Sequence, residues 1–109
     1  MKEIRAYVHR SRIADVVAAL RATWVDALGS DHNLAVYVVK GLATPRDDQE
    51  RRFSMELGDE VINEFKLEFL CEDALVDEMV TVISKSARTG QPTSGWIVVI
   101  DVARSLRIV

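Results

Sequence analysis

The chain has 109 residues, of which 49% are hydrophobic and 28% charged, and its formal net charge is −3 at pH 7. This length predicts a single globular domain, and the negative charge argues against a nucleic-acid-binding surface. The chain has no apolar run of about 20 residues and no signal-peptide pattern, and its one cysteine excludes an internal disulfide, so we expect a cytoplasmic protein without membrane insertion.

The first forty residues predict a strand, a helix and a second strand. Between residues 2 and 9, Ile4, Ala6 and Val8 share one face, which is typical of a half-buried strand. An apolar residue at every third or fourth position between 13 and 28 predicts an amphipathic helix, and Ser11 is a good N-cap for it. The valine-rich run 34–39 predicts the second strand.

Residues 43–60 have no regular period, and half of them are charged. A stretch of this length without secondary structure is uncommon in a small domain unless it is functional. We therefore interpret 43–60 as a long mobile loop within the single domain 1–109. A solvated loop or an extended hairpin without a role is the alternative.

The second half repeats the order strand, helix, strand. Alternation over 61–71 predicts a strand, helical spacing over 75–87 predicts a second helix, and the apolar run 96–102 predicts a strand buried on both faces. The whole order predicts an α+β fold, a ferredoxin-like βαββαβ sandwich. In this fold a four-stranded antiparallel sheet carries both helices on one face, and the long loop joins strands 2 and 3.

Several segments, in order and at the right spacing, resemble the P-II family of signal-transduction proteins. They are residues 1–6 and 16–20, 39–41, 66–68, 72–78 and Ala87-Arg88-Thr89-Gly90. The resemblance implies a homotrimer that binds ATP or ADP in clefts between subunits. It also implies that the 43–60 loop docks on an unidentified target enzyme, transporter or regulator. Such proteins report nitrogen, carbon and energy status and are not enzymes.

The resemblance also implies a nucleotide site near the turn 89–95. Backbone N–H groups of Thr89, Gly90 and Gly95 are suited to cradle phosphate oxygens. Gly41 matches a glycine of the family's nucleotide cleft, and Arg107 matches one of two arginines near the end of the chain. The alternative is that Gly90 only caps a helix and Gly95 only forms a turn.

This site departs from the family at four positions. Thr93, Ser94 and Trp96 replace a glycine, an aspartate and a phosphate-contacting lysine, and Val109 replaces the second arginine. Loss of the lysine removes a charge-assisted contact to phosphate. Trp96 either stacks on a nucleotide base or fills the space that the missing polar groups leave, and we favour the second interpretation.

The long loop departs from the family as well. Pro45 replaces a glutamine that helps to hold magnesium and 2-oxoglutarate, so we do not expect 2-oxoglutarate sensing. Leu57 replaces a tyrosine that some members have nucleotidylated, which excludes that modification. We expect the following loop residues to dock on the partner: Arg46, Asp47, Asp48, Glu50, Arg51, Arg52 and Leu57.

We find no pattern that predicts catalysis or a metal site. Asp77 and Glu78 are adjacent on a helix and face different ways, and the potential metal ligands His9, His32 and Cys71 lie on different elements. We expect a regulator that needs no cofactor and senses ATP, ADP or AMP. Two alternatives stay open: an interaction module that has lost nucleotide binding, and a sensor of inorganic carbon or metal status linked to transport.

Overall fold

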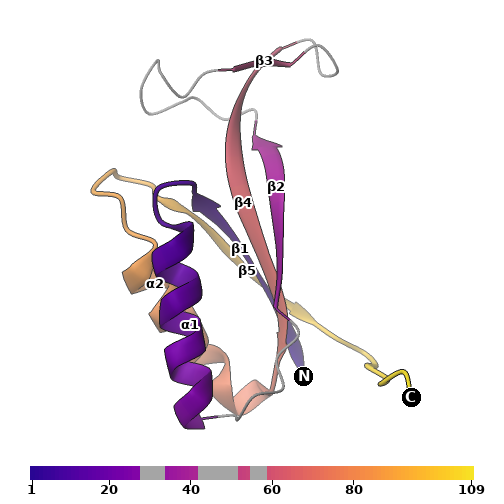
Figure 1. Ribbon diagram of the computed structural model, residues 1–109. Helices are drawn as coiled ribbons and strands as arrows, with labels where there is room; N and C mark the ends of the chain where they lie inside the picture. The colour runs from indigo at the N-terminus through magenta and orange to yellow at the C-terminus, as the bar shows by residue number, and fades with distance from the viewer. Residues whose placement is uncertain (28–33, 42–51, 55–58) are drawn as a thin grey trace.

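The computed structural model describes residues 1–27, 34–41, 52–54 and 59–109. Its elements follow the chain in an order that Figure 1 traces from the N-terminus to the C-terminus. They are β1 (Lys2–His9), α1 (Ile13–Ala27), β2 (Ala35–Gly41), β3 (Arg52–Ser54), β4 (Asp59–Cys71), the 3-10 turn η2 (Asp73–Leu75), α2 (Val76–Ser86) and β5 (Gly95–Asp101).

Four strands form one antiparallel sheet in the order β2-β4-β1-β5. β1 lies inside the sheet, with Ile4 opposite Phe69 of β4 on one side and opposite Val99 of β5 on the other. Both helices lie on the same face of this sheet (Figure 1). The predicted ferredoxin-like βαββαβ arrangement is therefore confirmed.

The short strand β3 lies within the segment that the sequence predicted as a loop. It pairs with the first residues of β4, so that Arg52 lies opposite Val61 and Ser54 opposite Asp59. β4 accordingly begins at Asp59, two residues before the predicted start, and it runs past the ends of β1 and β2 (Figure 1). Residues 43–51 and 55–58 lie outside the described residues, so the mobility of the loop stays a prediction.

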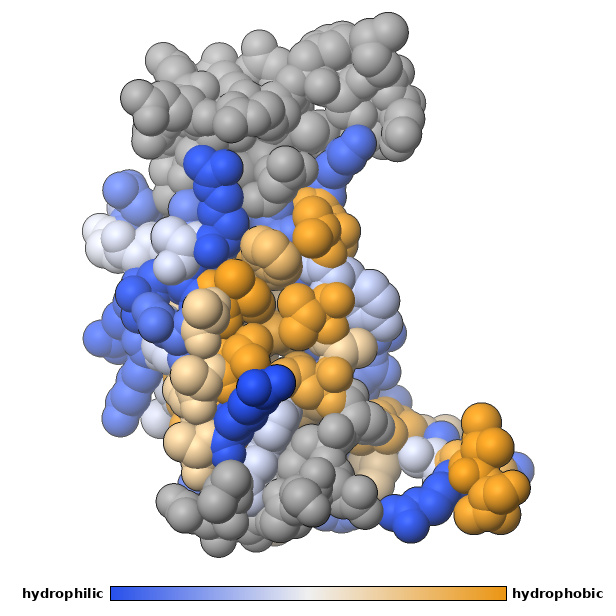
Figure 2. Space-filling model, viewed as in Figure 1, coloured by the Kyte–Doolittle hydropathy of each residue, from blue (hydrophilic) through white to orange (hydrophobic). Residues whose placement is uncertain are grey.

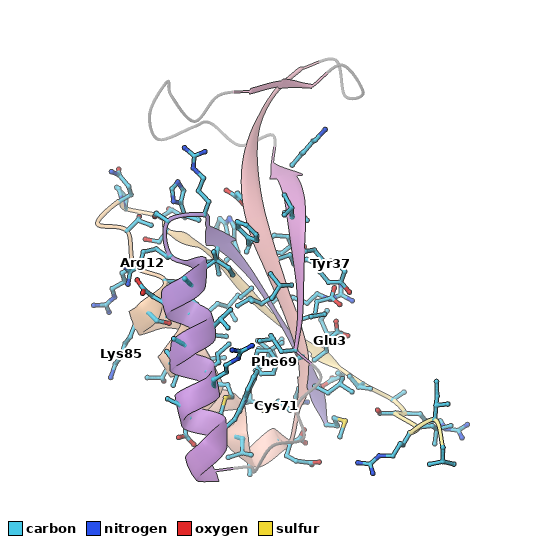
Figure 3. All side chains as sticks on the ribbon, viewed as in Figure 1. Glu3, Arg12, Tyr37, Phe69, Cys71 and Lys85 are labelled. Atoms are coloured by element: carbon cyan, nitrogen blue, oxygen red, sulfur yellow. The ribbon has the colours of Figure 1, made fainter. Side chains whose placement is uncertain are left out.

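The core lies between the sheet and the two helices. Trp24 of α1 contacts Phe69 of β4 edge-on, with ring centroids 5.4 Å apart and planes at 76°. Cys71 is buried beside them (Figure 3), and burial raises the pKa of its thiol, as expected for a cysteine that packs like a small apolar side chain. The buried apolar residues are Ile4, Ala6, Val8, Val16, Leu20, Trp24, Leu67, Phe69, Cys71, Met79 and Ile83.

The prediction that strand 96–102 is buried on both faces was wrong for the single chain. β5 lies at an edge of the sheet, pairs with β1 alone among the described strands, and ends at Asp101. Val98 and Val99, which point to opposite faces, are 41% and 43% exposed. A continuous apolar run therefore marks surface here, because neither face of an edge strand is fully covered.

A charged cluster occupies the centre of the sheet face that points away from the helices (Figure 3). Arg5 Nε lies 2.7 Å from Glu3 Oε1, and Lys66 Nζ lies 2.8 Å from Glu68 Oε1. The Tyr37 hydroxyl donates a hydrogen bond of 3.3 Å to Glu68 Oε2, and Lys66 Nζ lies 5.0 Å from the centroid of the Tyr37 ring. These contacts, and above all the hydrogen bond from Lys66, lower the pKa of Glu68 from its ordinary 4.5.

Glu68→Gln is expected to reduce the acid sensitivity of the fold. Because the pKa of Glu68 is lower in the folded than in the unfolded chain, its stabilisation is complete above about pH 4.5 and is lost as the pH falls through the folded value. The urea midpoint of the parent should therefore fall more steeply between about pH 5 and pH 3 than that of Glu68→Gln. Glu78→Gln, at an exposed position of α2, controls for the loss of one carboxylate. The prediction would be contradicted if the urea midpoint depended on pH equally steeply in the parent and in both variants.

Candidate functional site

The turn between α2 and β5 is held together by its own hydroxyl groups. The Thr89 N–H donates to Ser94 Oγ at 3.0 Å, and the hydroxyls of Thr89 and Ser94 are also 3.0 Å apart. The Gln91 N–H donates to Thr89 Oγ1 at 3.3 Å. Two backbone donors at the start of the turn are therefore already satisfied within the chain.

The two glycines of this turn meet different structural needs. Gly90 has φ +86°, and a Cβ built on it would meet nothing within 4 Å, so it needs glycine for its backbone conformation alone. Gly95 has φ +155°, and a Cβ there would overlap the carbonyl oxygen of Tyr7 on β1. Gly95 thus lets β5 start in close contact with β1, in register with Val8.

A cavity of about 440 Å³ lies between the end of α2, the turn and the first residues of β5. The Arg12 guanidinium ties the start of α1 to the end of α2 near this cavity, because its Nε donates to the Ser86 carbonyl at 3.0 Å (Figure 3). Most side chains around the cavity are apolar, and Arg88 is the one charged residue among the described residues that line it. The apolar lining residues include Ile83, Ala87, Pro92, Trp96 and Ile97.

Comparison with known proteins places the chain in a family. It is 31% identical over 108 residues to nitrogen regulatory protein P-II 1 of Escherichia coli K12 and, by the same measure, to nitrogen regulatory protein P-II of Klebsiella oxytoca. It is 28% identical to nitrogen regulatory protein P-II of Porphyra purpurea. Each alignment covers 99% of this chain and 91% of the relative. The chain belongs to the P-II family. A scan against models of protein families found no match.

Membership of the family settles the general activity of this P-II protein. P-II proteins are regulators of signal transduction and not enzymes, so the expectation of a non-catalytic regulator is confirmed. No helix in the described part of the chain has both the length and the apolar character needed to cross a bilayer. Of the potential metal ligands, His9 and Cys71 lie at opposite ends of the β1–β4 pairing, and His32 is outside the described residues.

The five residues predicted to bind nucleotide do not come together in one P-II chain. Thr89, Gly90 and Gly95 share the α2–β5 turn, and both glycines line the cavity. Gly41 ends β2, at the opposite edge of the sheet from β5. Arg107 lies in the tail that follows β5, at the far end of that strand from Gly95 (Figure 1). At about 3.3 Å per residue, the strand alone separates them by roughly 20 Å.

Within the single chain, the Trp96 side chain does not fill an enclosed space. The side chain is 70% exposed at the start of β5 and, like that of Tyr7 opposite it, points to the open face of the sheet. A filler would be enclosed by its neighbours, whereas this indole is presented to the solvent.

The predicted partner-docking residues fall mostly outside the described part of this P-II protein. Arg52 is the first residue of β3. The other six, which are Arg46, Asp47, Asp48, Glu50, Arg51 and Leu57, belong to the segments that the structure does not describe.

Proposed function

We propose that this P-II protein is a homotrimer that senses an adenine nucleotide in the clefts between its subunits and controls a target enzyme, transporter or regulator through the 43–60 loop. One observation carries the proposal. The turn with Gly90 and Gly95 is present, but Gly41 lies on the opposite edge strand of the same chain and Arg107 lies in the tail beyond the far end of β5. A neighbouring chain that contributes the missing groups would complete the site.

Exposed apolar side chains support an assembly of several copies. Figure 2 shows such side chains along β2 and at the C-terminal end of the chain, where Val38 is 66% and Leu106 76% exposed. On the open face of the sheet, the apolar side chains of Trp96 and Val98 flank the charged cluster. Apolar surface that gathers in this way is typical of protein–protein contacts, and a domain of about 100 residues gains stability when it is covered.

The path of β4 supports the role of the loop as the output element. β4 extends beyond the ends of β1 and β2 and carries β3 away from both helices (Figure 1). The segment between Gly41 and Asp59 is rich in both signs of charge, which suits a polar docking surface whose affinity depends on salt. A nucleotide bound beside Gly41 would act at the base of this segment. It would shift the loop only to the extent that it binds one loop conformation more tightly than another.

An interaction module without nucleotide binding is the second candidate. It is favoured by the internal hydrogen bonds of the turn, because the N–H groups of Thr89 and Gln91 are satisfied without a ligand. In that case the trimer would serve only to present its three loops.

Titration calorimetry with ATP, ADP and AMP tests the proposal on a sample whose mass in solution has been measured. We expect three times the chain mass of 12.2 kDa and a binding signal with at least one nucleotide. Arg107→Ala should weaken that binding about tenfold, the value of one charge-assisted hydrogen bond, whereas Arg104→Ala on the same tail should not. A folded trimer that binds none of the three would favour the interaction module. An unchanged affinity in Arg107→Ala would place the ligand elsewhere.

A further inference from the structure

We propose that the cavity between α2 and β5 binds a small amphipathic carboxylate, with the anionic group on Arg88 and the apolar body between the helix and the strand. The inference goes beyond the proposed function. The proposed nucleotide site needs groups from a neighbouring chain, whereas this cavity is lined by residues of one chain.

The cavity lies on the side of the sheet that carries the helices. Ile97 of β5 pairs with Ala6 of β1, which is fully buried beneath the helices. Directly paired residues point to the same face of a sheet, so Ile97 faces α2. The side chain of Trp96, at the alternate position, points to the opposite face. The space for a ligand is therefore bounded by α2, by the helix-facing side of β5 and by the turn that joins them.

The lining of the cavity is mainly apolar. Ile83 and Ala87 contribute from α2, and Pro92 contributes from the turn. Ala87 and Ile97 are partly buried and pack against the hydrophobic core, so the fold holds this apolar surface in place. The cavity volume of about 440 Å³ is within the roughly 300 to 1,000 Å³ of ordinary small-molecule sites. An aliphatic chain placed here would be removed from water on several sides.

Arg88 supplies the charge at this apolar site. It comes directly after the end of α2 and lines the cavity. Its guanidinium pairs with no carboxylate in the part of the chain that the structure describes. A guanidinium binds a carboxylate through two parallel hydrogen bonds, which are strongest where apolar neighbours exclude water. A cation without an acidic partner beside an apolar cavity is therefore suited to a ligand with one anionic group and an apolar body.

The hydrogen bonds of the turn favour one negative charge over several. The Thr89 N–H donates to Ser94 Oγ and the Gln91 N–H donates to Thr89 Oγ1, so neither donor is available to a ligand. Phosphate sites usually combine several backbone N–H groups with cationic side chains. In this cavity Arg88 would match the charge of a monocarboxylate, whereas a polyphosphate would lose water and keep charges without partners. The ligand class is therefore a carboxylate.

Titration calorimetry with octanoate, hexanoate and octanol tests the inference on the whole protein without nucleotide. Octanoate should bind about tenfold more tightly than hexanoate, because each buried methylene group adds about three- to fourfold in affinity. Octanol carries a similar apolar body without the charge, so its affinity reports the apolar contacts alone.

Arg88→Met tests the role of the charge. It should weaken octanoate binding about tenfold, the value of one charge-assisted hydrogen bond, and leave octanol binding within about twofold of the parent. Lys85→Met is the matched control, because it removes the same charge from an exposed position of α2 outside the cavity. It should change neither affinity.

Ser84→Phe tests the cavity itself. Ser84 is exposed on α2 and lines the cavity, so a phenyl ring there should occupy the space of the ligand. Binding of both octanoate and octanol should weaken by about tenfold or more, because their apolar contacts are lost. Thr81→Phe adds the same ring at an exposed position of α2 outside the lining and should leave both affinities unchanged.

Three results would overturn the inference. The first is a folded parent that does not bind octanoate. The second is equal octanoate affinity in the parent, Arg88→Met and Ser84→Phe, because the ligand would then lie elsewhere. The third is an equal loss in Arg88→Met and Lys85→Met, because net charge and not contact with Arg88 would then attract the ligand. All three leave the proposed function intact, since ATP, ADP and AMP are titrated separately.

Discussion

Gly95→Ala is expected to destabilise the folded chain by about 3 kcal/mol, because the new methyl group would occupy the space of the Tyr7 carbonyl oxygen. That oxygen belongs to the backbone of β1, which pairs on both sides within the sheet and cannot move aside alone. The φ of +155° adds backbone strain for any residue with a Cβ. Relief would require β5 to separate from β1 at its first residues, which also form one wall of the cavity.

Gly90→Ala is the matched control for this substitution. It lies in the same turn and also has a positive φ, but a Cβ there meets nothing within 4 Å. Its cost should be limited to the backbone conformation, about 1 kcal/mol. Urea unfolding of both variants measures the two losses. Equal destabilisation would show that backbone conformation, rather than the contact with Tyr7, decides the requirement for glycine at Gly95.

The order of elements could be predicted because each inner strand has a consistent pattern. In β1, Ile4, Ala6 and Val8 face the helices and Glu3 and Arg5 face away, which is the alternation of a sheet with one covered face. β4 repeats that alternation toward its end, where Leu67, Phe69 and Cys71 are buried. The strand β5 was predicted, but its burial could not be. An apolar run in one sequence looks the same whether the chain's own core covers it or it is exposed at the edge of the sheet.

The candidate site was predicted only in part, and the reason differs between its residues. Gly90 and Gly95 stand out because glycine marks unusual backbone positions, and both have positive φ. The role of Ser94 was missed, since its replacement of an aspartate was read as a loss, whereas its hydroxyl organises the turn. The positions of Thr89 and Ser94, on either side of a short turn, were the feature of the sequence that could have indicated this hydrogen bond. The placement of Gly41 and Arg107 relative to the turn depends on the strand order, which local patterns do not encode.

Leu20→Ala is expected to cost about 3 to 4 kcal/mol, near the centre of the range for buried leucines. Leu20 is fully buried between α1 and the sheet, and its neighbours along the same face, Val16 and Trp24, are buried as well. Removal of three carbon atoms there leaves a cavity that the flanking side chains and the paired strands can close only partly.

Arg21→Ala, at the next position on the same helix, controls for the change in helix propensity, since Arg21 is exposed and its loss should cost less than about 0.5 kcal/mol. Both values come from urea unfolding at several protein concentrations. Because Leu20 belongs to the buried core cluster of its own chain, its loss should be the same at every concentration, even though the stability of a homotrimer itself rises with concentration. A loss that changes with concentration would mean that Leu20 acts on the packing between subunits. The core beneath α1 would then be coupled to the homotrimer that we propose.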